Sequence, residues 1–370
     1  MIYLDHNATT HLHPSVYSKM QELTLYDPMN PSSVHSLGRR GKSLIEDARK
    51  SIARLLGFED QFKAYQITFT ASGTEANNLI LSNFKDSEIF ISATEHPSIW
   101  IHSEKSSNVT IIKVDKNGLL DLEHLRDKLQ NSKAEKKLLA VMLANNETGI
   151  IQPVKQIAEI AHGYGALVHS DCVQAVGKID INMIALDADF ISISAHKFGG
   201  PMGAGALVGK TSIGLKAQII GGGQERRLRA GTENVPAIVG FGQAASFAKI
   251  ELEARKSHMK KLRNKLEAAL LASDHNIEIA GINTERLPNT SLIINLDRRA
   301  ELQLIALDLK GVSVSSGSAC SSGKTTPSHV LASMGYSETQ MQSAIRISVG
   351  VTTTEQDIDA FLKIYNEINE

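Results

Sequence analysis

Five short apolar runs, each ending in polar residues, constrain the fold more than any other feature of this sequence. They occupy residues 66–70, 88–93, 138–143, 166–169 and 190–193. Segments with helical spacing or loop composition separate them. This alternation predicts an α/β fold with a mostly parallel sheet, whose ligand site lies along the carboxyl ends of the strands.

Two of these strand ends carry residues suited to cofactor chemistry. Lys197 comes shortly after the fifth run, and Asp171 comes shortly after the fourth. A pyridoxal phosphate site needs a lysine that holds the aldehyde and an acid that keeps the pyridine nitrogen protonated. The pair indicates such a site, and Gln174, Ser194 and His196 beside it support the interpretation. Taken alone, a lysine at this position is more often an ordinary loop residue.

The segment after the first run has the pattern of a helix start. Ser72 and Glu75 have capping-box spacing, so the free N–H groups of a helix should face the sheet edge. These groups can bind a phosphate, with Gly73 allowing close approach and Thr74 adding a hydroxyl. The pattern alone favours a plain helix cap over this phosphate site.

Several other polar residues leave two interpretations open. His96 follows the second run and either stacks on a planar cofactor or is incidental. Asn7 and its neighbours follow an N-terminal strand, where forming a turn is favoured over contacting a ligand. Arg346 lies in an alternating strand and either pairs with an acid or binds a ligand carboxylate through two hydrogen bonds.

The two cysteines differ in setting, and two are too few for a disulfide framework or an all-cysteine metal site. Cys320 lies within 312–324, a small, polar, glycine-punctuated segment that predicts a mobile loop open to solvent. Cys172 follows a buried strand, where a small packed hydrophobe is expected. Any reactive thiol is therefore expected to be Cys320.

The overall charge excludes several classes of partner. The chain has 39 basic and 40 acidic residues, a formal net charge of −1, which gives no surface for nucleic acid. No apolar run approaches a membrane span, and the N-terminus lacks the regions of a signal peptide. We therefore expect a cytoplasmic protein that binds neither nucleic acid nor membrane and holds no metal.

The sequence predicts two domains joined by a long helix. Residues 221–235 form a loop rich in glycine and arginine, which is equally typical of a linker and of a ligand contact. From 236 to about 271 the pattern predicts one long helix, straight or kinked. Beyond it we expect a strand at 291–296, a helix at 300–309 and a final helix after 354. The large domain is assigned to 13–255, and the small domain to 1–12 with 256–370.

Taken together, these motifs resemble the NifS/IscS-type cysteine desulfurases of the class V aminotransferase group, over essentially the whole chain. The matching motifs occur in order at 3–10, 30–33, 72–78, 94–96, 145–149, 194–197, 221–235 and 315–320. The resemblance implies a pyridoxal 5'-phosphate-dependent transferase of fold type I. Such an enzyme has a large domain with a mostly parallel sheet flanked by helices and a smaller α+β domain. It is usually a homodimer that takes sulfur from L-cysteine and leaves L-alanine.

The resemblance also implies a role for each site residue. Lys197 would carry the cofactor as a Schiff base, and the freed lysine would take the substrate's α-proton. Cys320 would accept sulfur as a persulfide, and His96 would cover the cofactor ring and move protons at the substrate thiol. Asp171 would contact the pyridine nitrogen of the cofactor, and Gln174 its phenolic oxygen. Asn146 would contact the ring and the substrate, and Arg346 the substrate carboxylate. The phosphate would be held by Gly73, Thr74, Ser194, His196 and the partner subunit's Thr232.

Alternatives remain at this level. The same cofactor residues would serve a class V aminotransferase, a selenocysteine lyase or another cysteine lyase, although Cys320 has no obvious role in those enzymes. A catalytically silent relative that carries sulfur or binds partners is a further alternative, against which the intact Lys197, Asp171 and Cys320 argue. The sulfur acceptor, an iron–sulfur scaffold, a thiolation carrier or a DNA-modification partner, is left open.

Overall fold

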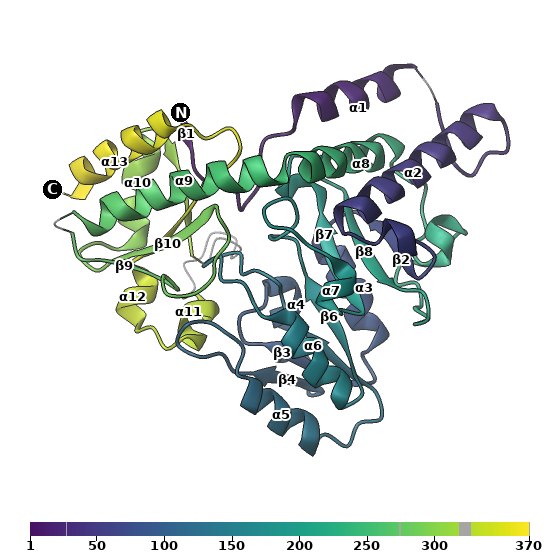
Figure 1. Ribbon diagram of the computed structural model, residues 1–370, viewed down its shortest axis with the longest axis horizontal. Coiled ribbons are helices and arrows are strands. Elements are labelled where there is room, and N and C mark those ends of the chain that lie inside the picture. The colour runs from purple at the N-terminus through teal and green to yellow at the C-terminus, as the bar shows by residue number, and fades with distance from the viewer. Residues whose placement is uncertain (27, 274, 318–326, 370) are drawn as a thin grey trace.

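The computed structural model describes residues 1–26, 28–273, 275–317 and 327–369, which form two lobes (Figure 1). The larger lobe is built around a seven-stranded sheet, and the smaller lobe contains the N-terminal strand and the last helix. Within these residues, the longest helices are too polar or too short to cross a membrane.

The seven-stranded sheet is mostly parallel, as the sequence predicts. Its order is β2-β8-β7-β6-β5-β3-β4. The strands are β2 Tyr65–Thr70, β3 Glu88–Ser92, β4 Val109–Ile112, β5 Lys137–Ala140, β6 Ala166–Asp171, β7 Phe190–Ser194 and β8 Gly205–Lys210. Only β8 runs against its neighbours in this sheet. The apolar pattern did not predict β4.

Alternate side chains of each central strand enter different cores on the two faces of the sheet. On β3, Ile89 and Ile91 join a cluster with residues of α3 (Gly73–Asn83), whereas Phe90 joins a cluster with residues of α2 (Ser36–Leu55). Because both faces are covered, apolar residues are required at successive positions rather than at every second one. This explains why the strands appear in the sequence as continuous apolar runs.

The other elements of the larger lobe are short or lie on the sheet faces. They are α1 Pro14–Tyr26, η1 Glu59–Gln61, α4 Pro97–Lys105, α5 Leu122–Asn131, α6 Val154–Gly163, α7 Met183–Leu186, η2 Ala195–Lys197, η3 Gln224–Arg227 and α8 Val235–Ile250. Helices α1, α2 and α8 lie together on one side of the lobe (Figure 1).

The long helix predicted up to residue 271 is interrupted. Helix α8 ends at Ile250, α9 (Leu252–Leu271) begins two residues later, and Glu251 between them has the non-helical angles φ −96° and ψ 2°. The two parts belong to different cores, since Phe241 of α8 packs in the larger lobe and Leu262 of α9 packs in the smaller one. The pair therefore bridges the lobes, as expected, but as two helices (Figure 1).

The smaller lobe has a four-stranded antiparallel sheet of order β12-β13-β10-β9. Its strands are β9 Ile277–Ile279, β10 Thr290–Asn295, β12 Ser315–Ser316 and β13 Ala344–Ser348, and its helices are α10 Ala300–Leu309, α11 His329–Ser333, α12 Glu338–Gln342 and α13 Glu355–Asn369. The predicted strand at 291–296 and the helices at 300–309 and after 354 are confirmed.

The N-terminal strand completes the smaller lobe. Strand β1 (Ile2–Tyr3) pairs in parallel with β11 (Val312–Ser313), and Asp5 forms a bridge with Ser348 of β13. The polar residues after β1 then continue toward the larger sheet. The exact domain limits, 13–255 and 1–12 with 256–370, stay a prediction.

Candidate active site

A cavity of about 290 Å³ lies where strands of the larger sheet end, and ten of the twelve site residues that the resemblance implies line it. Its lining is Asn7, Ala8, Ser72, Gly73, Thr74, Asn77, His96, Ser98, Met142, Asn146, Asp171, Val173, Gln174, Ser194, His196, Lys197 and Arg346. Thr232 is not part of this lining. Cys320, the predicted sulfur acceptor, lies outside the described residues. Of the segment 312–324 predicted as a loop, the first part instead forms the short strands β11 and β12.

Lys197 and Asp171 come from adjacent strands of the sheet. Strands β6 and β7 pair in parallel, with Asp171 opposite Ser192, and Lys197 ends the short helix η2 that follows β7. The Lys197 Nζ donates to the carbonyl oxygens of Asn7, at 2.6 Å, and Ala8, at 2.8 Å. The segment that leaves the N-terminal strand therefore holds the amine at the edge of the cavity.

Two N–H donors fix the direction of the Asp171 carboxylate. Oδ1 accepts from the Val173 backbone at 2.9 Å, and Oδ2 accepts from Asn77 Nδ2 at 2.8 Å. Asn77 lies on α3 and also donates to the Ser98 hydroxyl at 2.9 Å. Sequence reasoning missed Asn77, because the position of an asparagine inside a helical pattern does not show that its side chain contacts a residue at the end of a strand.

The ring of His96 is held in one orientation. Its Nδ1 accepts from the Ser98 backbone N–H at 3.1 Å and lies 2.8 Å from the Ser98 hydroxyl. Burial lowers the pKa of the ring, Asp171 opposes this shift, and Lys197 adds to it. We assign the neutral ring its proton on Nε2, since a backbone N–H can only donate to Nδ1.

The start of α3 leaves little room around its backbone. A Cβ on Gly73 would lie 2.7 Å from Val173 Cγ2, so any side chain here would force Val173 to move. Ser72 caps the helix, accepting from the Glu75 N–H at 3.1 Å. The other half of the predicted capping box does not form. The Glu75 carboxylate instead accepts from the Ala71 N–H at 2.9 Å and pairs with Arg229 at 2.9 Å.

Ser194 and His196 lie beside this helix start. A Cβ on Gly73 would be 3.6 Å from the Ser194 Cβ. The Nδ1 of His196 is 3.2 Å from the Thr9 hydroxyl, and burial lowers the pKa of the ring to about 4. At neutral pH and with no anion bound, His196 is therefore an uncharged hydrogen-bonding group, and a bound anion would oppose this pKa shift.

Arg346 has both an acid partner and an unused donor. Its Nη2 pairs with Asp5 Oδ1 at 2.7 Å, and its Nη1 donates to the Asn146 carbonyl at 3.0 Å. Its Nε is buried without a hydrogen-bond partner among the described residues. An unpaired buried donor is costly, which is consistent with a ligand acceptor at this position.

Thr232 lines a different hollow, of about 170 Å³, beside the edge strand β2. The loop before it is anchored to the larger lobe and is no free linker. The buried Glu225 accepts from Arg49 at 2.7 Å and from the Phe69 backbone at 2.8 Å. Glu225, Arg226 and Arg227 all have positive φ, between 47° and 68°, and this anchor stabilises that unusual backbone.

Cys172 is fully buried, which confirms the packing role expected for it. Burial raises the pKa of its thiol far above the ordinary value, and its Sγ lies 3.8 Å from the Ser170 hydroxyl. Because the thiolate is the nucleophilic form, Cys172 is unsuited to sulfur transfer at neutral pH.

Glu147 is a buried acid that sequence reasoning did not single out. Its Oε2 accepts from the Ser328 hydroxyl at 2.5 Å, and a Cβ on Gly317 would lie 3.4 Å from the same oxygen. Burial raises the pKa of Glu147 to about 7, although Ser328 and Arg346 act in the opposite direction. Its neighbour Asn146 lines the cavity, so this acid links the cavity wall to Ser328 of the smaller lobe.

Substituting Glu147→Gln should remove a pH-dependent loss of stability. In the folded state Glu147 binds its proton more tightly than in the unfolded state, where its pKa is 4.5. Protonated Glu147 therefore contributes its full stabilisation of the fold below about pH 4.5, and this contribution is lost as the pH rises through about 7. We expect the unfolding free energy of E147Q to match the wild type near pH 4.5 and to exceed it by roughly 3 kcal/mol above pH 8.

Urea unfolding of both proteins across this pH range measures the difference. Glu301→Gln, at an exposed position on α10, is the control and should give no such trend. A difference between E147Q and the wild type that is the same at every pH would contradict the raised pKa.

Comparison with known proteins gives consistent similarities. The family model for aminotransferase class-V matches residues 2–361. A cysteine desulfurase from Nostoc sp. is 40% identical, covering 100% of this chain and 93% of its own length. The cysteine desulfurase IscS of Dictyoglomus turgidum is 35% identical, covering 100% of this chain and 94% of its own. The X-ray structure of a NifS-like protein from Rickettsia africae superposes with a TM-score of 0.95 at 45% identity, covering 100% of this chain and 99% of that one.

Proposed function

The chain belongs to the aminotransferase class-V family and is a cysteine desulfurase that uses pyridoxal 5'-phosphate, and we propose that the 290 Å³ cavity is its active site. The observation that carries this proposal is the meeting of Lys197 and Asp171, from adjacent strands, at one cavity wall. Sulfur is taken from L-cysteine, leaving L-alanine, and Cys320 receives it as a persulfide.

The residues present fit pyridoxal phosphate. Gly73 keeps the first turn of α3 open to a phosphate, with Thr74, Ser194 and His196 adding donors. Asp171 is held for the pyridine nitrogen by Asn77 and Val173. The unpaired Nε of Arg346 is available for a substrate carboxylate. The Gln174 amide is assigned to the phenolic oxygen, and Thr232 of the partner subunit to the phosphate.

When bound, pyridoxal phosphate supplies an electron sink that makes the α-proton of an amino acid removable. Lys197 Nζ, which lies at the cavity wall, would be the base that takes this proton. His96 would cover the ring face and would move a proton at the substrate thiol through Nε2, and Asn146 would contact both ring and substrate. The Cys320 thiolate would attack the substrate sulfur, so that a sulfur–sulfur bond forms as the carbon–sulfur bond breaks. The electron pair of the broken bond stays with the substrate, whose carbon takes up a proton to leave alanine.

A direct test combines product analysis with mass spectrometry. Incubating the protein with L-cysteine under limiting reductant should give alanine in proportion to a sulfur adduct on the peptide that contains Cys320. Alanine without the adduct would contradict the role of Cys320. Pyruvate or another keto acid in place of alanine would instead indicate a lyase or a transaminase.

Substituting Arg346→Lys should weaken substrate binding. Lysine keeps the charge, but its single Nζ cannot replace the Asp5 and Asn146 contacts and also supply the donor that Nε offers to a carboxylate. We expect the KM for L-cysteine to rise about 10- to 100-fold with a smaller change in kcat. Arg286→Lys is the matched control, because Arg286 is a buried arginine of the same lobe that pairs with Glu267. Equal KM changes in both variants would contradict a specific role for Arg346.

The wider setting of the enzyme is also part of this proposal. We infer a cytoplasmic homodimer that passes persulfide sulfur to an acceptor protein, such as an iron–sulfur scaffold or a thiolation carrier. Relatives named NifS-like and IscS support this setting. Light scattering at micromolar concentration should give twice the chain mass of 40.2 kDa, and a monomer would contradict the assignment of Thr232 to a partner's site.

A further inference from the structure

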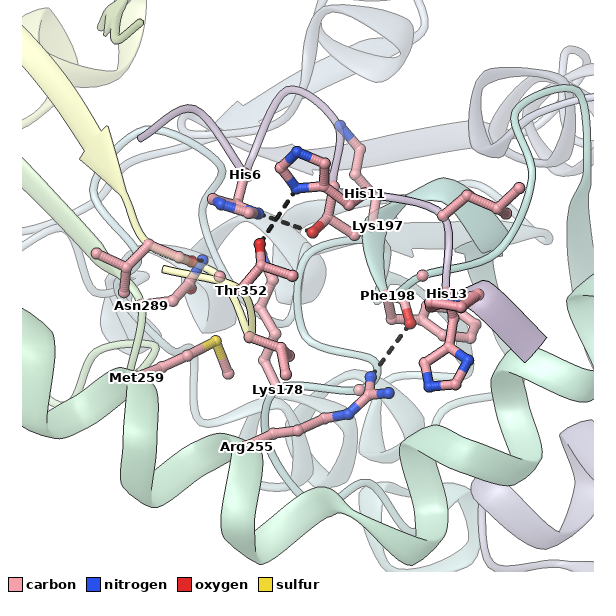
Figure 2. A pocket seen from close by; sticks show the side chains of 18 residues that line it. His6, His11, His13, Lys178, Lys197, Phe198, Arg255, Met259, Asn289 and Thr352 are labelled. Carbon is pink, nitrogen blue, oxygen red and sulfur yellow. Dashed lines mark hydrogen bonds between the residues drawn. The ribbon is translucent and has the colours of Figure 1, made fainter. Parts of the chain in front are cut away.

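A second cavity, of about 90 Å³, lies behind the active-site wall between the two lobes (Figure 2). Residues from both lobes line it, and Lys197 is shared with the larger cavity. Lys178 also lines it and is only 4% exposed. The roles proposed above give this buried lysine no function.

Lys178 donates hydrogen bonds to two amide oxygens. Its Nζ lies 2.8 Å from Asn7 Oδ1 and 2.9 Å from Gln174 Oε1. Burial lowers the pKa of Lys178 strongly, and Lys197 and Arg346 add to the shift. An uncharged amine still has two N–H groups, so both hydrogen bonds persist in either protonation state.

These contacts determine which end of the Gln174 amide faces the active site. The Asn7 carbonyl can only accept, so the amide nitrogen of Gln174 must face it, and Oε1 is the end that faces Lys178. The amide nitrogen then faces the other way, where Nε2 donates to the Asn7 carbonyl at 3.0 Å. Gln174 also lines the larger cavity, which leaves its second N–H as the group available to a ligand there.

The same contacts reach Lys197 through Asn7. The Asn7 carbonyl that accepts from Gln174 also accepts from Lys197 Nζ at 2.6 Å. The Asn7 side chain is itself fixed, because Nδ2 donates to Thr290 Oγ1 at 2.9 Å and Oδ1 accepts from Asn289 at 3.0 Å. Lys178 is thus joined to a rigid group of amides behind the cofactor site.

We infer that Lys178 is a positioning residue, which holds the amide of Gln174 with its nitrogen toward the cofactor's phenolic oxygen. This inference rests on the proposed function, specifically on the assignment of Gln174. Without Lys178, the Asn7 carbonyl is the one group among these contacts that still orients the amide. The amide is then held less firmly, and its oxygen can turn toward the negatively charged phenolic oxygen. The bound cofactor would then lose a hydrogen-bond donor.

The pH titration of the cofactor's visible absorption band tests the inference without measuring turnover. An N–H donor stabilises negative charge on the phenolic oxygen and lowers the midpoint of this titration. Lys178→Met should therefore raise the midpoint by about one pH unit, the size expected for one hydrogen bond to a charged group. Lys210→Met is the matched control, since Lys210 pairs with Asp189 and should leave the midpoint unchanged.

A double-mutant cycle with Gln174→Met separates orientation from charge. If Lys178 acts through Gln174, the double variant should titrate like Q174M alone. Lys178→Gln, which removes the charge but keeps a donor, should shift the midpoint less than K178M and should have no added effect in the Q174M background. The K178Q cycle also replaces the K178M cycle if K178M fails to fold.

Several results would overturn the inference. The midpoint could be unchanged in K178M, or K178M and K178Q could shift it equally. The shift in the double variant could equal the sum of the K178M and Q174M shifts, or Q174M alone could leave the midpoint unchanged. Failure of the proposed function would be seen separately, because the wild-type protein would then show no borohydride-sensitive visible band. In that case the inference about Lys178 would also be wrong.

Discussion

Lys197→Ala should abolish the borohydride-sensitive visible absorption of the protein and lower alanine formation from L-cysteine by at least about a thousandfold. The reason is that Lys197 is both the cofactor's attachment point and the proposed base for the α-proton. Lys178 cannot replace it, because its Nζ is already directed at Asn7 Oδ1 and Gln174 Oε1 on the far side of the wall.

Absorption spectra and alanine assays on the purified variant measure this effect. Lys210→Ala provides the control, since Lys210 is a partly buried lysine that pairs with Asp189 away from the cavity. The Lys197 assignment would be contradicted by a K197A variant that keeps the reducible band, or that retains a tenth or more of the wild-type rate.

The second large effect is expected for Cys320→Ala. Alanine formation and sulfur transfer should again fall by about a thousandfold or more, while the visible band stays at its wild-type intensity. The two properties separate because the proposal assigns Cys320 to the substrate sulfur and assigns the cofactor contacts to other residues. Loss of the band in K197A and its retention in C320A would therefore distinguish cofactor attachment from sulfur acceptance.

Cys172→Ala is the control that the chain itself offers. Cys172 is fully buried, and burial raises the pKa of its thiol, so its removal should leave sulfur transfer near the wild-type rate. Near-normal turnover by C320A would rule out its thiol as the acceptor. It would favour a direct lyase or aminotransferase reaction at the same cofactor residues.

The larger sheet was predictable because burial on both faces leaves continuous apolar runs in the sequence. Strand β4 lacks this signal, since only Ile112 of its four residues is buried. The reversed direction of β8 leaves no signal either, because an apolar strand has the same composition whichever way it runs. The break at Glu251 was equally hidden, because glutamate is a residue that favours helices. The break arises because the helices on its two sides pack in different cores, which the local sequence does not show.

The candidate site was predictable where a residue type carries its own chemistry. A lysine and an aspartate after strands can be identified from a single sequence, and both line the cavity. Asn7 could not, because residues after a strand commonly form turns and its hydrogen bonds reach residues as distant as Thr290. Lys178, Asn77 and Glu147 escaped for the same reason, since each acts through contacts that only the folded chain creates.

The pairing of β1 with β11 also sets the order of events during synthesis. The partner of Ile2 is Val312, about 310 residues later. At roughly 5–20 residues per second, the first strand waits about 15 seconds to a minute for it on the ribosome. Asn7 and Ala8 follow that strand and hold the Lys197 amine. The nascent chain therefore cannot complete its cofactor site until most of the smaller lobe has been translated.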